Sequence, residues 1–301
     1  MINASSVSVH PPVWKSYVEL CKPNVVAEMI FTAWVGMLLA VPDFPTLDKV
    51  LYGLFGIGLA AASAAAVNQY VERDMDIYLN AHRPIPSGRI SPQQAIIFAV
   101  ILGVLSMLIL IFKVNGLTAT LSFVALLGYA FIYTSFLKKM TSQNIVIGGI
   151  FGSAPPLLGW TAITNEVHPY GLLLVLIIFV WTPPHFWPLA IARYDKLKKA
   201  YEEHGIRMLP VTHGLAYTRL QILLWSILLL LVTLLPYLTG MSGLVYLTTA
   251  VLFGLGFMGF AILMMRTKSN KTAMQTFWYS IVYITVLFAG LLGDHYYRFT
   301  L

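Results

Sequence analysis

Three oxygen-bearing side chains within residues 68–76 have the types and the spacing of a metal site. Asn68, Glu72 and Asp76 follow one another at intervals of four residues in the segment NQYVERDMD. On an α-helix this spacing places all three on one face, each about one turn from the next. Amide and carboxylate oxygens suit a hard divalent ion such as magnesium, which proteins bind through one or two carboxylates together with substrate phosphates. The pattern therefore predicts a magnesium and phosphate site.

Arginines near these oxygens could bind the phosphates. Arg73, Arg83 and Arg89 lie within or just after the same segment, and a guanidinium group matches the geometry of a phosphate. The simpler interpretation is a helix end that carries solvated charges. Against it, carboxylates are costly close to hydrocarbon, and Asn68 lies inside an uncharged apolar stretch, Leu51–Tyr70, where an amide needs a partner. Metal and phosphate binding explains the pattern better.

A second polar segment, from Trp181 to Gly214, contains further candidates. Arg193, Asp195 and Lys196 follow directly after an apolar stretch, so we expect them close to the membrane. Two interpretations stay open for them, a phosphate or metal role and a simple positive anchor on the inner side. The charges at residues 198–203 fit an amphipathic surface helix better.

His185 lies inside an apolar segment that is rich in proline and aromatic residues, WTPPHFWP. A lone histidine in such a place is usually a hydrogen-bonded structural residue. Pro183 and Pro184 are expected to break a spanning helix next to it, and Phe186 and Trp187 flank it. This setting leaves a metal-ligand role open as the alternative.

The elements that must position these residues are membrane-spanning helices. The chain has 301 residues, of which 58% are apolar and only 10% are charged, whereas a soluble domain carries about 25% charged residues. The single cysteine, Cys21, excludes an internal disulfide and gives no cysteine spacing for a metal. The first 23 residues contain no apolar core of a cleavable signal, so we expect the first spanning helix to be retained.

Nine apolar stretches approach the length of roughly 20 residues that a spanning helix needs. They cover residues 25–41, 50–70, 95–112, 117–137, 145–164, 172–192, 220–238, 244–265 and 273–293. The first is short and carries Glu28, and proline pairs at 155–156 and 183–184 are expected to break the fifth and the sixth. We predict an all-α polytopic membrane protein, a bundle of nine transmembrane helices forming one domain over residues 1–301, with residues 1–23 as a cytoplasmic segment.

The basic residues predict how this bundle is oriented. With nine spans, all but three of the 19 lysines and arginines fall on the side of the N-terminus; the exceptions are Lys49, Lys113 and Arg298. The positive-inside rule then makes the N-terminus cytoplasmic and places the C-terminus outside. The acidic residues at 72–76 and 195–203 fall on the same side, after the second and the sixth helix. We therefore expect a cytoplasmic functional face that both loops build together.

Several segments resemble the UbiA superfamily of intramembrane prenyltransferases. NQYVERDMD is similar to the family motif N-x-x-x-D-x-x-x-D, with Glu72 in place of the middle Asp. Two segments, NIVIGG at 144–149 and WTPPHFW at 181–187, are similar to the branch that modifies haem. Further support comes from ELCKPNVV at 19–26, RPIPSGRISP at 83–92, MLPVTHG at 208–214 and LLGDHYYR at 291–298. The resemblance covers nearly the whole chain.

The resemblance implies a fold, a reaction and a set of roles. Members of this branch move the farnesyl group of farnesyl diphosphate onto a vinyl group of haem b and make haem O, with magnesium assisting the ionisation. The resemblance implies that Asn68, Glu72 and Asp76 bind magnesium. It also implies that Arg73, Arg83 and Arg89 bind the diphosphate, and that His185 binds haem. The family's second acidic motif falls at residues 192–196, where Asp195 is the acid that remains. We expect Asp195 to be catalytic, and Lys196 with Arg193 to act as fixed cations on the diphosphate in place of a full second metal site.

The same resemblance implies the partners and the place of the protein. They are farnesyl diphosphate, haem b and the lipid bilayer of a bacterial inner membrane, with a haem A synthase or terminal-oxidase assembly downstream and no nucleic acid. One alternative keeps the chemistry and changes the acceptor to an aromatic quinone precursor. A transporter would need acids at mid-membrane on several helices, and an assembly factor would leave the spacing of residues 68–76 unexplained.

Overall fold

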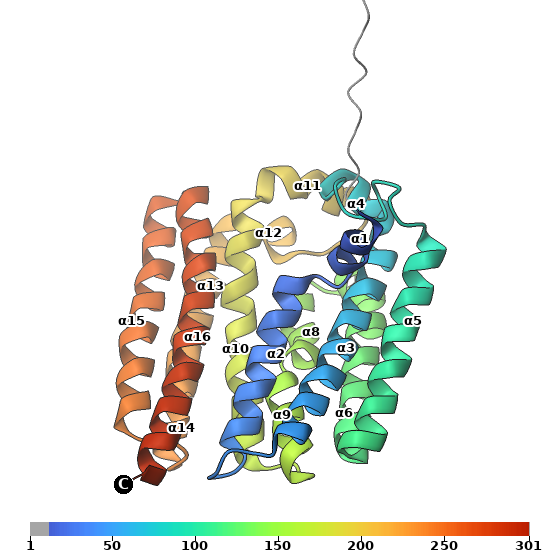
Figure 1. Ribbon diagram of the computed structural model, residues 1–301. Helices are drawn as coiled ribbons and strands as arrows, with labels where there is room; N and C mark the ends of the chain where they lie inside the picture. Colours follow the sequence, from blue (N-terminus) through green and yellow to red (C-terminus); the bar gives the residue numbers. More distant parts are fainter. Residues whose placement is uncertain (1–11, 301) are drawn as a thin grey trace, which may run out of the picture.

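The fold is a bundle of long helices with short helices gathered at one end (Figure 1). The structure is a computed structural model that describes residues 12–300, with side chains as far as Tyr297. Residues 1–11, part of the expected cytoplasmic segment, lie outside the described residues. The elements are α1 (Val13–Leu20), α2 (Pro23–Leu39), α3 (Leu47–Val71), α4 (Arg73–Leu79), α5 (Pro92–Ile109), η1 (Leu110–Val114), α6 (Gly116–Leu127), η2 (Gly128–Leu137), α7 (Lys138–Met140), α8 (Asn144–Gly152), α9 (Pro155–Thr164), α10 (Pro169–Ala192), α11 (Tyr194–Glu203), α12 (Leu209–Thr212), α13 (Gly214–Thr233), α14 (Leu235–Leu238), α15 (Leu244–Thr267) and α16 (Asn270–Thr300).

The predicted membrane spans are present in the bundle. Within residues 12–300, eight helical stretches are long and apolar enough to cross a membrane. They are Leu47–Val71, Pro92–Val114, Gly116–Met140, Asn144–Thr164, Pro169–Ala192, Gly214–Leu238, Leu244–Thr267 and Asn270–Tyr297. The first predicted span corresponds to α2, which is apolar but only 17 residues long. The all-helical membrane fold is therefore confirmed, with α2 as the short ninth helix.

The short helix α2 is held in place by unusually close packing on α9. A Cβ atom added to Gly36 would lie 2.1 Å from the carbonyl oxygen of Pro156, and one added to Gly159 would lie 1.9 Å from the carbonyl oxygen of Ala33. Both distances are impossible for a real side chain, so glycine at each position allows the two backbones to touch. This contact fixes the C-terminal half of α2 against α9.

Prolines act differently in the fifth and the sixth span. The fifth is interrupted between Gly152 and Pro155, as predicted, and forms α8 and α9. The expected break in the sixth span is wrong, because α10 continues through Pro183, Pro184 and Pro188. The segment is buried and packs against α13 and α16, and Trp181 donates a hydrogen bond of 2.9 Å to the carbonyl of Ser280 on α16. Neighbouring helices can hold a proline-containing helix together in this way.

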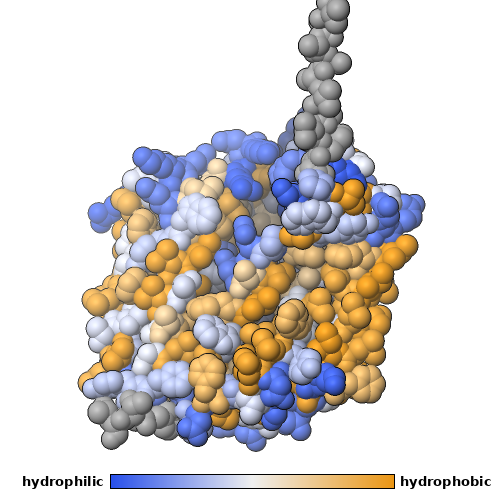
Figure 2. All heavy atoms as spheres, viewed as in Figure 1, coloured by the Kyte–Doolittle hydropathy of each residue, from blue (hydrophilic) through white to orange (hydrophobic). Residues whose placement is uncertain are grey.

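The two ends of the bundle are polar and its middle is apolar. Figure 2 shows a belt of apolar side chains between polar ends, as expected where lipid surrounds a protein. The short helices α1, α4, α11 and α12 lie at one end, and the C-terminal end of α16 lies at the other (Figure 1). The predicted cytoplasmic loops are thus at the same end of the molecule.

The end of α16 is tied to two other segments. Asp294 is buried and accepts hydrogen bonds from the hydroxyl of Ser242, at 2.8 Å, and from the backbone N–H of Gly243. The next residue, His295, contacts the carbonyl oxygen of Val41, just after α2, through its Nε2 at 3.0 Å. These contacts hold the ends of α2, α15 and α16 together at the end of the bundle opposite α4.

Candidate active site

The three predicted metal ligands lie together where α3 passes into α4. Asn68 is in the last turn of α3, Glu72 joins the two helices, and Asp76 is in α4. Helical hydrogen bonds continue across the junction, from Glu72 N to Asn68 O at 3.0 Å and from Asp76 N to Glu72 O at 2.9 Å. The spacing therefore keeps its helical geometry, and the side chains of Asn68 and Asp76 are almost completely buried.

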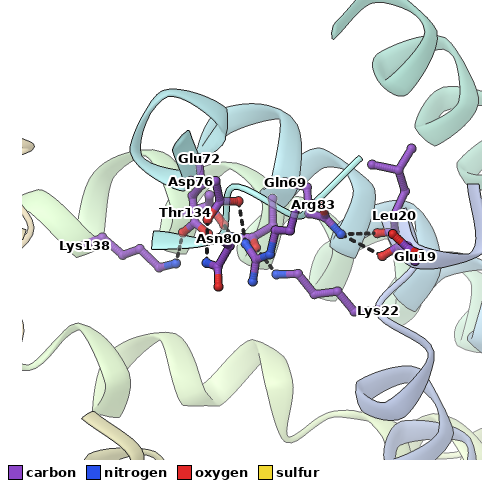
Figure 3. Close-up of polar contacts among 11 residues, drawn as sticks. Glu19, Leu20, Lys22, Gln69, Glu72, Asp76, Asn80, Arg83, Thr134 and Lys138 are labelled. Atoms are coloured by element: carbon purple, nitrogen blue, oxygen red, sulfur yellow. Dashed lines mark hydrogen bonds and ion pairs between the residues drawn. The ribbon is translucent and has the colours of Figure 1, made fainter. Parts of the chain in front are cut away.

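Each of these oxygen groups contacts a different cation. Lys22 donates to Asn68 Oδ1, Lys138 pairs with Glu72 Oε1, and Arg83 Nη1 lies 2.5 Å from Asp76 Oδ2. Figure 3 shows Lys22 and Lys138 on opposite sides of these oxygen groups, with Lys138 bound to Glu72. We call these six side chains the cation–oxygen cluster. Its basic members come from three segments, the residue before α2, the loop between α4 and α5, and α7.

Further hydrogen bonds orient the oxygens. Asn68 Nδ2 donates to Thr134 Oγ1 at 3.2 Å, which leaves Oδ1 as the atom that faces Lys22. Asn80 Nδ2 donates to the second oxygen of Asp76 at 2.8 Å. Thr134 belongs to η2, a π-helical stretch, and such stretches occur often at functional sites because they shift side chains out of the α-helical register.

Burial and charge shift the pKa values of two members of the cluster. Burial, the largest effect, lowers the pKa of Lys22 to about 8, and the opposing effect of Glu72 does not restore it. Burial alone would raise the pKa of Glu72, but the charges of Lys138 and Lys22 outweigh it and hold that pKa below its usual value. Glu72 is therefore ionised and available as an anionic ligand at neutral pH.

The structure brings only one of the three predicted arginines to the oxygens. Arg83 joins the cluster, whereas Arg73 donates to the carbonyl of Tyr70, stacks on its ring and lies 3.7 Å from Asp74. Arg89 is also engaged elsewhere, because it lies 2.5 Å from Glu19 Oε2 and donates to Ser16 Oγ at 3.0 Å and to the carbonyl of His82 at 2.6 Å. It connects α1 to the loop before α5.

The two polar loops lie side by side, as the sequence predicted. α11 packs against α4, and the rings of Tyr78 and His204 are 5.6 Å apart. Burial raises the pKa of Tyr201 on α11 to about 12, and the charges of Lys138 and Glu72 also act on this phenol. Tyr201 is therefore close to the cation–oxygen cluster, and α11 covers one side of it.

The predicted residues of the second loop lie at the rim of this arrangement. Arg193 ends α10, and Asp195 and Lys196 are in the first turn of α11. All three are exposed. In the part of the chain that the structure describes, their side chains form no ion pair and no hydrogen bond, so they are free to contact a bound molecule.

His185 lies in α10, away from the cluster, in a tight aromatic setting. Its ring stacks on Trp181 at 4.1 Å and on Phe277 at 4.8 Å between centroids, and Nδ1 is 2.7 Å from Ser280 Oγ. The hydroxyl of Ser280 already donates to the carbonyl of Phe277 at 2.6 Å. A hydroxyl has a single hydrogen, so in the contact with His185 it must accept. Nδ1 then carries the proton, and Nε2 keeps the lone pair that a metal ligand needs.

Lys22 and Lys138 are the functional candidates that the sequence did not reveal. In the sequence both stand only among the basic residues expected on the cytoplasmic side, and they lie 46 and 66 residues away from the oxygens they contact. A usable signal existed for Lys22, which stands directly before the first apolar stretch within the segment ELCKPNVV. No comparable signal separates Lys138 from its neighbour Lys139.

The donor set fits magnesium bound together with a phosphate group. Between residues 12 and 297, no group of three or more histidines, cysteines and acids could hold a metal by itself. One amide and two carboxylates instead provide a partial set of oxygens, and magnesium commonly completes such a set with water and substrate phosphates. The three nearby cations could balance the charge of the phosphates.

The chain is similar in sequence to proteins of one family. A sequence model described as the UbiA prenyltransferase family matches residues 29–287. A protein named protoheme IX farnesyltransferase from Methylococcus capsulatus is 54% identical over 285 residues, which cover 94% of each chain. A protein of the same name from Saccharophagus degradans is 54% identical over 299 residues, covering 98% of this chain and 97% of the relative.

Solved structures with a similar arrangement of helices are more distant in sequence. A structure concerning digeranylgeranylglyceryl phosphate synthase has a TM-score of 0.77 and 18% identity, over 95% of this chain and 99% of that chain. A UbiA homolog from Archaeoglobus fulgidus bound to GPP and Mg2+ has a TM-score of 0.66 and 17% identity, over 92% and 99% of the two chains. At these identities the likeness shows a shared fold.

Proposed function

The chain belongs to the UbiA prenyltransferase family, and from this premise we propose that it transfers the farnesyl group of farnesyl diphosphate to a vinyl group of protohaem IX, giving haem O. Relatives that share half of its residues over nearly their whole length are named for this activity. The structural observation that carries the proposal is the cation–oxygen cluster, which combines ligands for magnesium with cations for a diphosphate.

Asn68, Glu72 and Asp76 would hold the magnesium. When bound, magnesium neutralises negative charge that grows on the leaving diphosphate, which is electrostatic catalysis at a site shielded from water. Binding of GPP and Mg2+ by a family member of the same fold supports a divalent metal here. Around it, Lys22, Arg83 and Lys138 contact the diphosphate oxygens.

The exposed residues of the second loop complete the site from the rim. Arg193 and Lys196 act as further cations on the diphosphate, and Asp195 contacts the metal–diphosphate complex from the first turn of α11. Their exposure and their lack of partners within the described residues support this role. We assign Arg73 and Arg89 to holding neighbouring segments instead, because their guanidinium groups contact Tyr70 and Glu19 and not the oxygens of the cluster.

The reaction follows from this placement. The bond between the first farnesyl carbon and the diphosphate oxygen breaks, and the electron pair leaves with the diphosphate. The haem vinyl group attacks the resulting allylic cation, water adds to the new cation beside the porphyrin, and one proton is released. The cytoplasmic helices α4 and α11 cover the site and limit the access of water before the vinyl group has reacted.

His185 is proposed as a ligand of the haem iron. Its Nδ1–H is bound by Ser280, so the lone pair at Nε2 is available, and two stacked rings fix the plane of the imidazole. Histidines that bind metals generally have such a partner on the other nitrogen. The alternative is a purely structural contact between α10 and α16.

The place of the protein in the cell follows from its charges. We infer that it is a multi-pass protein of a bacterial inner membrane, with α1, α4 and α11 on the cytoplasmic side. The excess of lysine and arginine at this end supports the orientation, and the last helix ends on the opposite side (Figure 1). Haem O made here would pass to a haem A synthase or to a terminal-oxidase assembly.

Mass spectrometry of extracted haems tests the function directly. Membranes from cells that express the chain should contain haem O, and membranes without it should not. Purified protein with magnesium and farnesyl diphosphate should farnesylate haem b and leave 4-hydroxybenzoate unchanged. Prenylation of 4-hydroxybenzoate with no haem product would instead identify an aromatic prenyltransferase.

A further inference from the structure

The cation–oxygen cluster has a one-to-one arrangement that the proposed reaction alone does not require. Each of the three ligand groups contacts its own basic side chain: Asn68 with Lys22, Glu72 with Lys138, and Asp76 with Arg83. The cations approach from separate segments of the chain, and each contacts one oxygen atom of a proposed metal ligand. A cation that served only the diphosphate could lie farther from these oxygens.

A divalent ion that uses the contacted atoms, Asn68 Oδ1, Glu72 Oε1 and Asp76 Oδ2, as ligands must displace the basic groups. The pair of Lys138 and Glu72 is largely buried, with side-chain exposures of 14% and 11%. Separating such a pair leaves a charge without a partner in a poorly solvated place, which is strongly unfavourable. A displaced ammonium group therefore needs a new anionic partner close by.

The net charge of the cluster leads to the same conclusion. Two carboxylates and three cations leave about one net positive charge. A bare divalent ion would add two more positive charges to this, whereas magnesium together with an ionised prenyl diphosphate carries about one net negative charge and would neutralise the cluster.

On the basis of the function proposed above, we propose that Lys22, Arg83 and Lys138 make this site selective for magnesium that arrives with a diphosphate, and that they keep free divalent ions out. The basic side chains hold the three ligand groups in place. When magnesium diphosphate binds, they move from the ligand oxygens to the phosphate oxygens. These three residues thus determine whether the site accepts a free divalent ion or only a metal diphosphate. Metal and diphosphate then bind with strong positive coupling.

Direct metal binding tests this proposal without measuring turnover. Purified protein is dialysed to equilibrium against Mn2+, with and without inorganic pyrophosphate, and the retained manganese is measured. The wild-type chain should retain about one equivalent with pyrophosphate and bind Mn2+ alone at least about tenfold more weakly. Lys138→Met should bind Mn2+ alone about tenfold more tightly than the wild type and lose most of the coupling to pyrophosphate. Lys22→Met is a second variant with the same expectation.

Lys139→Met is the matched control, because Lys139 is the adjacent residue with the same charge but is exposed and contacts none of the ligands. If Lys138→Met and Lys139→Met raised the affinity for Mn2+ alone by the same factor, the cause would be the general loss of a positive charge. That result would overturn the proposal. Wild-type protein that binds Mn2+ equally well without pyrophosphate would overturn it too, while the proposed function would stand. Wild-type protein that retains no manganese under either condition would remove the metal site of the proposed function itself.

Discussion

Of the three proposed metal ligands, Asp76 has the most fully defined surroundings. It is 1% exposed, and its two oxygens accept hydrogen bonds from Arg83 and Asn80. Asp76→Asn keeps the shape of the side chain and removes its charge. We expect turnover to fall by about 100-fold or more, because a bound metal supplies several kcal/mol of charge stabilisation. The measurement is the rate of haem O formation at saturating magnesium.

Asp74→Asn is the control for this substitution. Asp74 lies two residues away on the same helix, but its side chain is 73% exposed, and within the described residues its one ion pair is with Arg73, at 3.7 Å. Its loss should leave the rate within about twofold of the wild type, since exposed ion pairs contribute little. Similar losses in both variants would mean that Asp76 has no special role as a metal ligand.

The tautomer of His185 leads to a prediction about haem binding. His185→Ala should weaken the binding of haem b by about 10-fold to 100-fold and change its absorption spectrum, because the iron loses its ligand. Ser280→Ala keeps the imidazole but removes the group that fixes its proton, so a smaller loss in the same direction is expected. If both variants kept the wild-type spectrum and only melted earlier, His185 would be a structural residue.

The part of the site that could be predicted is the part that one helix carries. Asn68, Glu72 and Asp76 follow the helical repeat, and continuous backbone hydrogen bonds make that repeat a reliable guide. Lys22 and Lys138 reach the same place through tertiary packing, which a local pattern does not contain. Arg89 shows the opposite case, since it is close in sequence and yet turns toward Glu19.

At the scale of the elements, α1 is held by contacts that determine where Lys22 lies. Arg89 bonds to Ser16 and Glu19, and Gln69 Nε2 donates to the carbonyls of Glu19 and Leu20 at 2.8 and 3.1 Å. Because Lys22 follows directly after α1, we infer that these contacts position it beside Asn68. If the proposed function holds, Arg89 would act on the diphosphate indirectly, through α1 and Lys22.

Removing either partner of the Arg89–Glu19 pair should therefore have the same effect. We expect Arg89→Met and Glu19→Gln each to raise the KM for farnesyl diphosphate about threefold to tenfold, and the double variant to be no worse than the poorer single one. The measurement is a double-mutant cycle on KM and kcat. If Arg89 bound the diphosphate directly, Glu19→Gln would leave KM unchanged or lower it.

The contact between α2 and α9 makes a prediction about stability. Gly36→Ala places a methyl group where the carbonyl of Pro156 lies, so we expect a loss of about 1–3 kcal/mol in the free energy of unfolding. Gly152→Ala on α8 is the control, because nothing lies within 4 Å of the added Cβ. That variant should be neutral or stabilising by up to about 1 kcal/mol. Reversible unfolding in detergent measures both.

The prolines show why breaks within a helix are harder to predict than the positions of the membrane spans. Pro155 follows a real break, but Pro183 and Pro184 lie inside a continuous helix. The sequence around each pair is similarly apolar, and the difference lies in the packing of α10 between its neighbours. The π-helical stretch η2, which carries Thr134 and leads to Lys138, had no signal in the hydrophobic pattern either.

At the scale of the whole molecule, the positions of the spans could be predicted within a few residues. Length and hydropathy decide whether a segment can cross a bilayer, and both are properties of the sequence alone. Which helices touch could not be predicted, because an apolar surface that faces lipid has the same composition as one that faces another helix. The close contact of α2 with α9 is an example.

The orientation of the molecule can be tested with reporter fusions. Alkaline phosphatase joined after Leu301 should be active, because it would be exported, and the same enzyme inserted in the loop after α11, at His204–Gly205, should be inactive. A cytoplasmic fluorescent reporter should give the opposite pattern. Phosphatase activity at both positions would place them on the same side of the membrane. That result would contradict the odd number of spans predicted between them.

The hydrogen bonds of Asp294 and His295 have a consequence for how the product leaves. They join the ends of α2 and α16 that lie opposite α4, through Val41 and the loop before α15. If these helices separate, the gap must therefore be widest at the end of the bundle that carries α4. In the orientation proposed above, a farnesylated porphyrin, which is large, flat and apolar, would then leave sideways into the inner leaflet. Whatever takes it up next would have to collect it from that leaflet, by lateral diffusion in the membrane.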